Sequence, residues 1–248
     1  MSANFLLSFF RKTKYRFGNL LRAASAPWLE ASISPNAATS IFGCCFGDDG
    51  WHHLRQTLKE YDENPKREIK ETAMWKFLKN FCPNGISVFA NIEYQDPLPL
   101  FVYPWIDLSN LGEKPKDPKS SRFCGPSSDE FVRKEYLRTI SLYKKIKSQG
   151  YKPSHYPHSL ISGTFLISRS GKKRFIVMQG NHRMAVLAHL GYSEILVRAN
   201  TGTIPFVDER KIKTWPNVRN GRCSVEHAGE VFNYFFKKNG SEISQLSN

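Results

Sequence analysis

The sequence predicts a mixed α/β fold, with a small α/β core between an N-terminal helical extension and a C-terminal helix. Three observations support this prediction. Hydrophobic residues make up 40% and aromatic residues 13% of 248 residues, enough for a buried core. Apolar residues recur every three or four positions in several segments, as in helices. Short β-type runs alternate with them. We expect an extension of loops and helices over residues 1–94, a core over 95–213 and a helical segment over 214–248.

The N-terminal extension contains one clear helix. Residues 23–65 are rich in Ser, Pro, Gly and Asn and predict loops around a short segment, Trp51–Tyr61. A helix is expected over Lys66–Asn80, where four apolar residues lie four apart: Ile69, Ala73, Phe77 and Phe81. Residues 4–22 alternate apolar and basic side chains. They predict either a helix that docks on the domain or a weak contact with an anionic membrane surface.

The core region begins with less regular sequence. A strand is expected at Ile86–Ala90, followed by the aromatic stretch Pro97–Trp105, whose rings fit a hydrophobic core. Residues 111–122 have almost no apolar side chains and predict an exposed loop. A long helix follows, with Ser127 and Glu130 as a capping box and Gly150 at its end.

The second half of the core predicts a hairpin, a helix and a strand. The hairpin strands are Thr164–Ser168 and Arg174–Met178, joined by a glycine-containing turn. The helix Asn181–Leu190 stops at a glycine, and the strand Glu194–Ala199 follows. Ser224 is then expected to cap the C-terminal helix.

Charge and cysteine content limit the partners and the compartment. The formal net charge of +14 favours anionic partners such as nucleotides or nucleic acid. Nucleic acid is not favoured, because the basic residues are dispersed and no DNA- or RNA-binding signature occurs. No stretch approaches the ~20 apolar residues of a transmembrane segment. Five cysteines without a C-x-x-C motif predict free thiols and a cytoplasmic location. The alternative is a zinc site at Cys44-Cys45 with His52-His53.

The segment Gln179-Gly-Asn-His-Arg183 joins a predicted strand to a predicted helix and has the features of a phosphate site. Gly180 permits a sharp turn and a close approach of ligand to the backbone. The first amides of the helix lack intrahelical acceptors, so they favour an anion. Arg183 adds a planar cation suited to phosphate oxygens, and His182 can donate a hydrogen bond or carry a proton.

Each of these residues also has an ordinary structural explanation. Asn181 could cap the helix, His182 could be a surface histidine, and Arg183 could be a solvated helix charge. Their coincidence within five residues, between a strand and a helix, favours the phosphate site.

The same segment resembles a known family. Gly-Asn-His-Arg, followed by Met-Ala-Val-Leu-Ala-His-Leu-Gly-Tyr, is similar to the Gly-x-His-Arg box of the ParB/sulfiredoxin superfamily, and the similarity extends over about Pro126–Asn200. The resemblance implies a small α/β phosphate-binding core that binds ATP or another nucleotide, with Mg²⁺ as an accompanying cation. It implies phosphate contacts from Gly180, His182 and Arg183, with Asn181 as the fourth residue of the nucleotide-binding box.

Two positions depart from the family pattern. Asn181 stands where the sulfiredoxins carry their cysteine nucleophile, which argues against sulfinic acid repair. Gln179 stands where the kinase-like members usually carry an aspartate. A kinase or phosphotransferase acting on an unidentified small molecule still needs charge neutralisation and usually a base.

The candidate catalytic residues are Glu130, Glu135 and His182, because in the superfamily the helix that carries the two glutamates adjoins the box. The glutamates are equally explained as a cap and a solvated helix face. The alternative function is a non-catalytic module, regulated by nucleotide or binding nucleic acid.

Three further groups of residues have weaker claims. Asp208 and Glu209 follow the last strand and could bind a metal, although no metal site is expected overall. The loop Trp215–Arg222 could stack on a base or hold a phosphate, or be an ordinary loop with exposed arginines. His155 and His158 could line the rim of a pocket, or simply lie in a loop.

Overall fold

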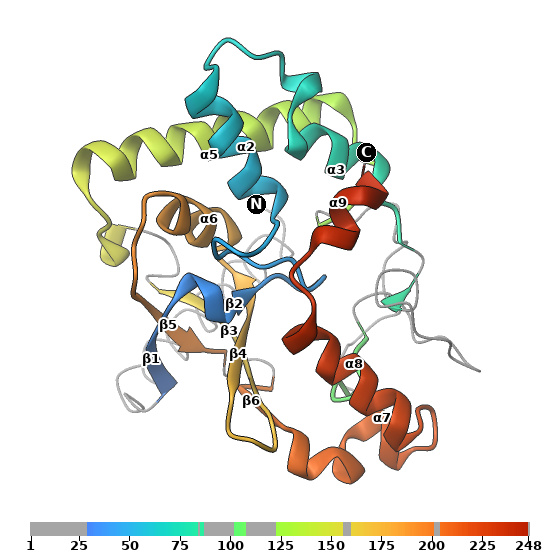
Figure 1. The fold of residues 1–248 in the computed structure, drawn as a ribbon. Coiled ribbons are helices and arrows are strands. Elements are labelled where there is room, and N and C mark those ends of the chain that lie inside the picture. The colour runs from blue at the N-terminus through green and yellow to red at the C-terminus, as the bar shows by residue number, and fades with distance from the viewer. Residues whose placement is uncertain are drawn as a thin grey trace, which may run out of the picture.

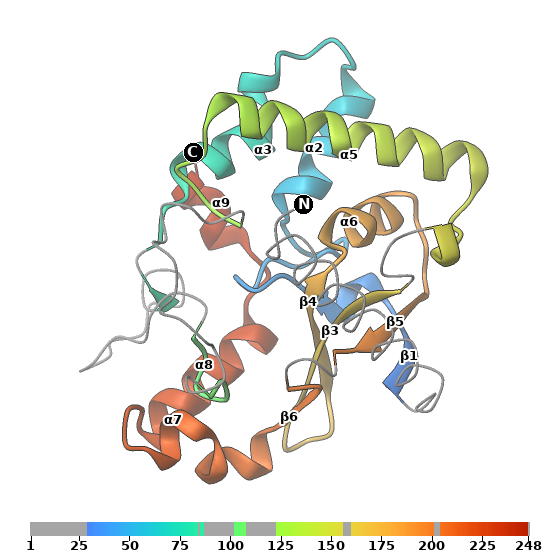
Figure 2. The same cartoon turned by 180° about the vertical axis from the view of Figure 1, so that it is seen from behind.

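The computed structural model describes residues 29–83, 85–86, 102–107, 123–155, 160–200 and 204–247. It has helices around a curled mixed sheet, so the predicted mixed α/β fold is confirmed (Figure 1). Helices α2, α3, α5 and α6 lie at one end of the sheet, and α7 and α8 lie to one side of strand β4, toward its opposite end (Figures 1 and 2).

The sheet is built on the predicted hairpin. Strands β3 (Ile161–Ile167) and β4 (Lys173–Gln179) pair antiparallel, as the alternation of their residues predicts. On the other side of β3, β5 (Ile195–Ala199) runs parallel to its first half and β6 (Phe206–Asp208) parallel to its second half. The strand order is β1-β5-β3-β4-β2, with β6 beside β3.

The two outer strands come from the N-terminal region. β1 (Glu30–Ile33) pairs antiparallel with β5, and β2 (Ala38–Thr39) pairs parallel with β4. The prediction of loops over residues 23–65 was therefore wrong at these two strands, whereas the short segment predicted at Trp51–Tyr61 corresponds to helix α2 (His53–Glu63). Both strands are very short, so they lack a local pattern and owe their conformation to pairing with the longer strands.

The helices coincide with the apolar stripes predicted from the sequence, but the first residue of α3 and the capping residue of α5 differ from the prediction. The helix predicted from Lys66 is α3 (Ala73–Asn80), capped by Thr72 and preceded by a short 3-10 turn. The long helix is α5 (Asp129–Gln149), which ends at Gly150 as predicted, but Ser128 caps it instead of Ser127. Ser127 instead donates its amide hydrogen to the carbonyl of Leu78.

The other helices are α2 (His53–Glu63), α6 (Asn181–His189), α7 (Pro216–Arg219), α8 (Val225–Lys237) and α9 (Ser241–Ser247). Ser224 caps α8 as predicted. The predicted segments 4–22 and 111–122 lie outside the described residues, as do most of the strand 86–90 and the first half of the aromatic stretch 97–105.

The core contains a cluster of large aromatic rings around α8. Tyr103 and Trp105 stack at a centroid distance of 5.1 Å, and the Trp105 ring meets those of Trp215 and Phe232 edge-on. All four side chains are buried. The described half of the aromatic stretch 97–105 is therefore core, as predicted.

The other sequence-level expectations concern cysteines and membranes. All five cysteines lie within the described residues and carry free thiols, as predicted. None of the helices in the described ranges combines the length and the apolar character that crossing a bilayer requires.

Candidate functional site

The predicted phosphate-binding segment forms a tight turn between β4 and α6. Gly180 has φ 96° and ψ 23°, a left-handed conformation that side chains other than glycine rarely adopt. Gly180 itself is the N-cap of α6, so the alternative role of Asn181 as the cap is wrong. The amide of Met184 is the first to bond within the helix, to the carbonyl of Gly180 at 2.9 Å. The amides of residues 181–183 therefore form the electropositive end of α6.

The side chain of Arg183 folds back over this turn. A Cβ atom placed on Gly180 would lie 3.1 Å from the Nη2 atom of Arg183 and 3.3 Å from its Nε atom. The same guanidinium reaches the carbonyl of Leu160, with Nη2 at 3.5 Å from the oxygen. Arg183 is only 7% exposed, so it is a buried cation rather than the solvated helix charge of the alternative interpretation.

Asn181 adds a polar group at the same place. Its Oδ1 atom is buried and has no hydrogen-bond partner among the described residues. A buried carbonyl oxygen without a donor is unfavourable, so this atom is suited to accept a hydrogen bond from a ligand or a water molecule.

His182 points toward α5 and joins the two helices. Its Nε2 atom lies 2.8 Å from a carboxylate oxygen of Glu135, and its Nδ1 atom lies 2.8 Å from the hydroxyl oxygen of Thr139. The Thr139 hydroxyl also lies 2.8 Å from the backbone carbonyl of Glu135. The hydrogen bond from His182 holds the pKa of the Glu135 carboxyl below its usual value, against the opposing effect of burial. Glu135 and His182, two of the three predicted catalytic residues, are thus brought together.

A second histidine–carboxylate pair lies at the other end of α6. Nε2 of His189 is 2.8 Å from a carboxylate oxygen of Asp62, which also accepts a hydrogen bond from the hydroxyl of Tyr143. Lys147 in turn donates to that hydroxyl oxygen. His182 and His189 are seven residues apart and therefore lie on the same face of α6. Sequence reasoning missed this second pair; the seven-residue spacing of the two histidines was its only signal.

The side chains of α5 that contact these two histidine–carboxylate pairs also lie on one face of their helix. Glu135, Thr139, Tyr143 and Lys147 are each four residues apart, so they form one stripe along the helix. The first two meet His182, and the third meets the Asp62–His189 pair. The stripe therefore positions α6, and with it the Gly180 turn.

We expect the pair of Glu135 and His182 to make stability depend on pH. Because folding lowers the pKa of Glu135, the ionised carboxylate contributes to the free energy of unfolding. This contribution is complete above the ordinary pKa of 4.5 and is lost as the pH falls through the pKa of the folded state. Glu135→Gln should therefore cost about 1 kcal/mol at neutral pH and flatten the acid loss of stability. Urea unfolding at several pH values tests this. Glu68→Gln, at an exposed position, is the control and should change neither quantity; equal pH profiles for wild type and Glu135→Gln would contradict the expectation.

The third predicted catalytic residue, Glu130, lies away from this pair. It is exposed in the first turn of α5, and no hydrogen bond or ion pair joins it to the described residues of α6. Asp208 and Glu209 are also separate: Asp208 binds Arg210, and Glu209 accepts the amide hydrogen of Arg169.

The zinc alternative finds no support in the described part of the chain, where no three His, Cys, Asp or Glu side chains are arranged to hold a metal ion. His52 is buried and its Nδ1 atom accepts the amide hydrogen of Leu54 as the cap of α2. Burial lowers the pKa of His52 to about 3, so this ring is neutral. The ring stacks on Phe46 at 4.0 Å.

The other weak candidates have structural roles or lie outside the description. Trp215 is buried in the aromatic core, so it is not available to stack on a base. His155 is exposed in a short 3-10 turn, and His158 lies outside the described residues.

Comparisons with known proteins add no identification: no family model, curated protein or solved structure matches the chain.

Proposed function

We propose that this chain binds the phosphate groups of a nucleotide of the ATP or ADP type at the N-terminus of α6. The observation that carries the proposal is the buried guanidinium of Arg183 beside the left-handed turn at Gly180. A helix N-terminus and an arginine both favour an anion, and here the two positive features converge on one turn. The resemblance of residues 180–183 to the ParB/sulfiredoxin box supports the same proposal. Mg²⁺ would arrive at this site on the phosphate oxygens of the nucleotide.

In this proposal the four residues of the box have different roles. Arg183 and the first amides of α6 contact phosphate oxygens, and Gly180 leaves room for the arginine side chain to fold back over the turn. The Oδ1 atom of Asn181 accepts a hydrogen bond from the ligand or its hydration shell. His182 has both ring nitrogens engaged on α5, so it orients the turn.

A phosphotransferase acting on a small molecule is the second candidate, and the pair of Glu135 and His182 favours it. A carboxylate hydrogen-bonded to an imidazole is a group that can accept and return a proton, as the acceptor hydroxyl of a phosphoryl transfer requires. Binding without transfer, as in a nucleotide-regulated module, is the alternative.

Calorimetric titration with ATP, ADP, CTP and GTP, each with and without Mg²⁺, tests the binding proposal. We expect Arg183→Gln to weaken the tightest of these interactions about tenfold or more, since a charge-assisted hydrogen bond contributes about 1.5–3 kcal/mol. Arg133→Gln removes one exposed positive charge from α5 and is the matched control, expected to leave the affinity unchanged. Thermal unfolding of both variants shows whether they remain folded.

Two results would contradict the binding proposal. The first is that none of the four nucleotides binds more tightly than about millimolar, about −4 kcal/mol. The second is that folded Arg183→Gln binds as well as Arg133→Gln. Incubation of bound ATP with candidate metabolites then separates the two functions: unchanged ATP favours the regulatory module.

A further inference from the structure

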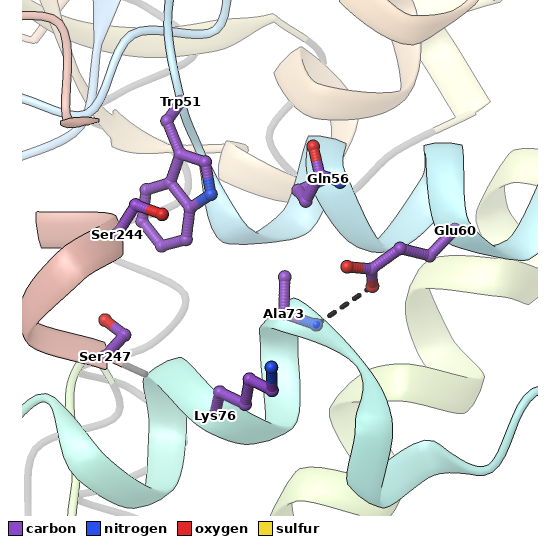
Figure 3. A pocket seen from close by; sticks show the side chains of 7 residues that line it. All are labelled: Trp51, Gln56, Glu60, Ala73, Lys76, Ser244 and Ser247. Atoms are coloured by element: carbon purple, nitrogen blue, oxygen red, sulfur yellow. Dashed lines mark hydrogen bonds between the residues drawn. The ribbon is translucent and has the colours of Figure 1, made fainter.

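A concave site lies away from the α6 turn, between α2, α3 and α9 (Figure 3). Its volume is about 320 Å³. Trp51, which precedes α2, lines it together with Gln56 and Glu60 of α2, Lys76 of α3, and Ser244 and Ser247 of α9. Ligand pockets occupy about 300–1,000 Å³, so this one lies at the lower end of the range and suits a small molecule.

Hydrogen bonds hold the walls of this pocket in place at both ends of α9. Before the helix, the amide of Trp51 donates to the carbonyl of Asn239 at 2.9 Å, and the side-chain amide of Asn239 donates to the carbonyl of Asp49 at 2.7 Å. At its end, the side-chain amide of Asn80 donates to the carbonyl of Ser247 at 3.0 Å. The pocket is therefore formed before any ligand enters, which reduces the entropic cost of binding.

Two opposite charges face the same pocket space. Figure 3 shows the carboxylate of Glu60 and the ammonium of Lys76 pointing toward it from α2 and α3. One carboxylate oxygen of Glu60 accepts the amide hydrogen of Ala73 at 2.9 Å, and the carboxylate also accepts a hydrogen bond from the Gln56 side chain. A carboxylate has about four lone-pair sites, so it retains capacity to accept from a ligand. Lys76 forms no ion pair within 4.0 Å among the described residues. The two charges are therefore both available to a ligand.

The remaining wall residues complement these charges. Hydroxyl groups of Ser244 and Ser247 lie on the α9 side, and the Trp51 indole adds a half-buried aromatic wall (Figure 3). Burial raises the pKa of Glu60, so a cationic group beside its carboxylate would offset an existing desolvation cost. A molecule with a cationic end, an anionic end and a short apolar part complements Glu60, Lys76 and Trp51, respectively.

We propose that this pocket is a binding site for a free α-amino acid. Its ammonium contacts Glu60, its carboxylate contacts Lys76 and the Ser244 hydroxyl, and its side chain lies against Trp51. The site is separate from the phosphate site in position and in ligand chemistry. It gives the chain a second ligand whether or not nucleotide binds at α6.

Ligand-observed NMR with each of the twenty common L-amino acids at millimolar concentration tests the proposal on the full-length protein. We expect at least one to bind saturably at a single site. Calorimetry on the best of them should show that Lys76→Gln and Glu60→Gln each weaken binding about tenfold or more, because each removes one charge-assisted contact. Lys66→Gln, at an exposed loop position, is the matched control and should bind as the wild type does.

The amine that lacks the carboxylate of the best ligand should bind the wild type about tenfold or more weakly than the parent amino acid does. This amine should bind the wild type and Lys76→Gln with equal affinity. The proposal is overturned if none of the twenty binds, if both pocket variants bind as tightly as Lys66→Gln, or if the decarboxylated amine binds as well as its parent. Nucleotide affinity of Lys76→Gln, expected to equal that of the wild type, separates failure of this site from failure of the phosphate site.

Discussion

Gly180→Ala is expected to weaken nucleotide binding at least about tenfold and to lower the free energy of unfolding by about 1–3 kcal/mol. The backbone at Gly180 has φ 96°, a conformation that strains any residue with a Cβ atom. The new methyl group would also lie 3.1 Å from both Nη2 of Arg183 and Cγ1 of Ile161. Because the arginine side chain is the more flexible neighbour, we expect it to be displaced, which removes a proposed phosphate contact.

Gly171→Ala is the matched control for this variant. Gly171 has φ 81° in the turn between β3 and β4, and a Cβ atom there would meet nothing within 4 Å. The two variants therefore share a left-handed backbone conformation, and only Gly180→Ala also crowds Arg183 and Ile161. Chemical denaturation and calorimetric titration of both separate the effects. An affinity lost equally in both variants, or in neither, would contradict the role of the Gly180 turn in phosphate binding.

Phe232→Ala should produce the largest loss of stability, about 3–5 kcal/mol. The Phe232 ring is completely buried and packs between Trp105, Trp215 and Phe236, at centroid distances of 6.1, 5.6 and 5.2 Å. Removing it leaves a cavity that these rigid neighbours cannot fill, and it also removes aromatic pair contacts. Urea denaturation measures the change.

Leu137→Ala is the control for the Phe232 variant. Leu137 is 62% exposed on α5, so its truncation should change stability by no more than about 0.5 kcal/mol. The aromatic cluster is also distinct from the α6 turn, so Phe232→Ala should retain the wild-type nucleotide affinity below its unfolding temperature. A loss below about 1 kcal/mol for Phe232→Ala would mean that the cluster is not part of the cooperative core.

Local sequence was enough to locate the elements around the candidate phosphate site. The β3–β4 hairpin, α6, β5 and α8 were predicted within a few residues, because each has its own apolar periodicity and a cap or glycine at its end. The turn at Gly180 was predicted for the same reason: glycine between a strand and a helix signals a backbone conformation that other residues avoid.

Partners far apart in the chain could not be found in this way. Glu130 and Glu135 were equal candidates in the sequence, yet only Glu135 meets His182, because it lies on the side of α5 that packs against α6. The pairing of β1 with β5 joins residues more than 160 positions apart and has no signal in either strand.

The sequence by itself thus determined the β3–β4 hairpin, α5, α6, β5 and α8, the charge of the chain and the position of the Gly-Asn-His-Arg turn. Only the tertiary structure decided that Arg183 is buried, that His182 is engaged on α5, and that Glu60 and Lys76 face one pocket. The physical reason is that periodicity and capping are properties of neighbouring residues. Burial and charge pairing depend instead on which helices pack together, and here those helices are brought together from distant parts of the chain.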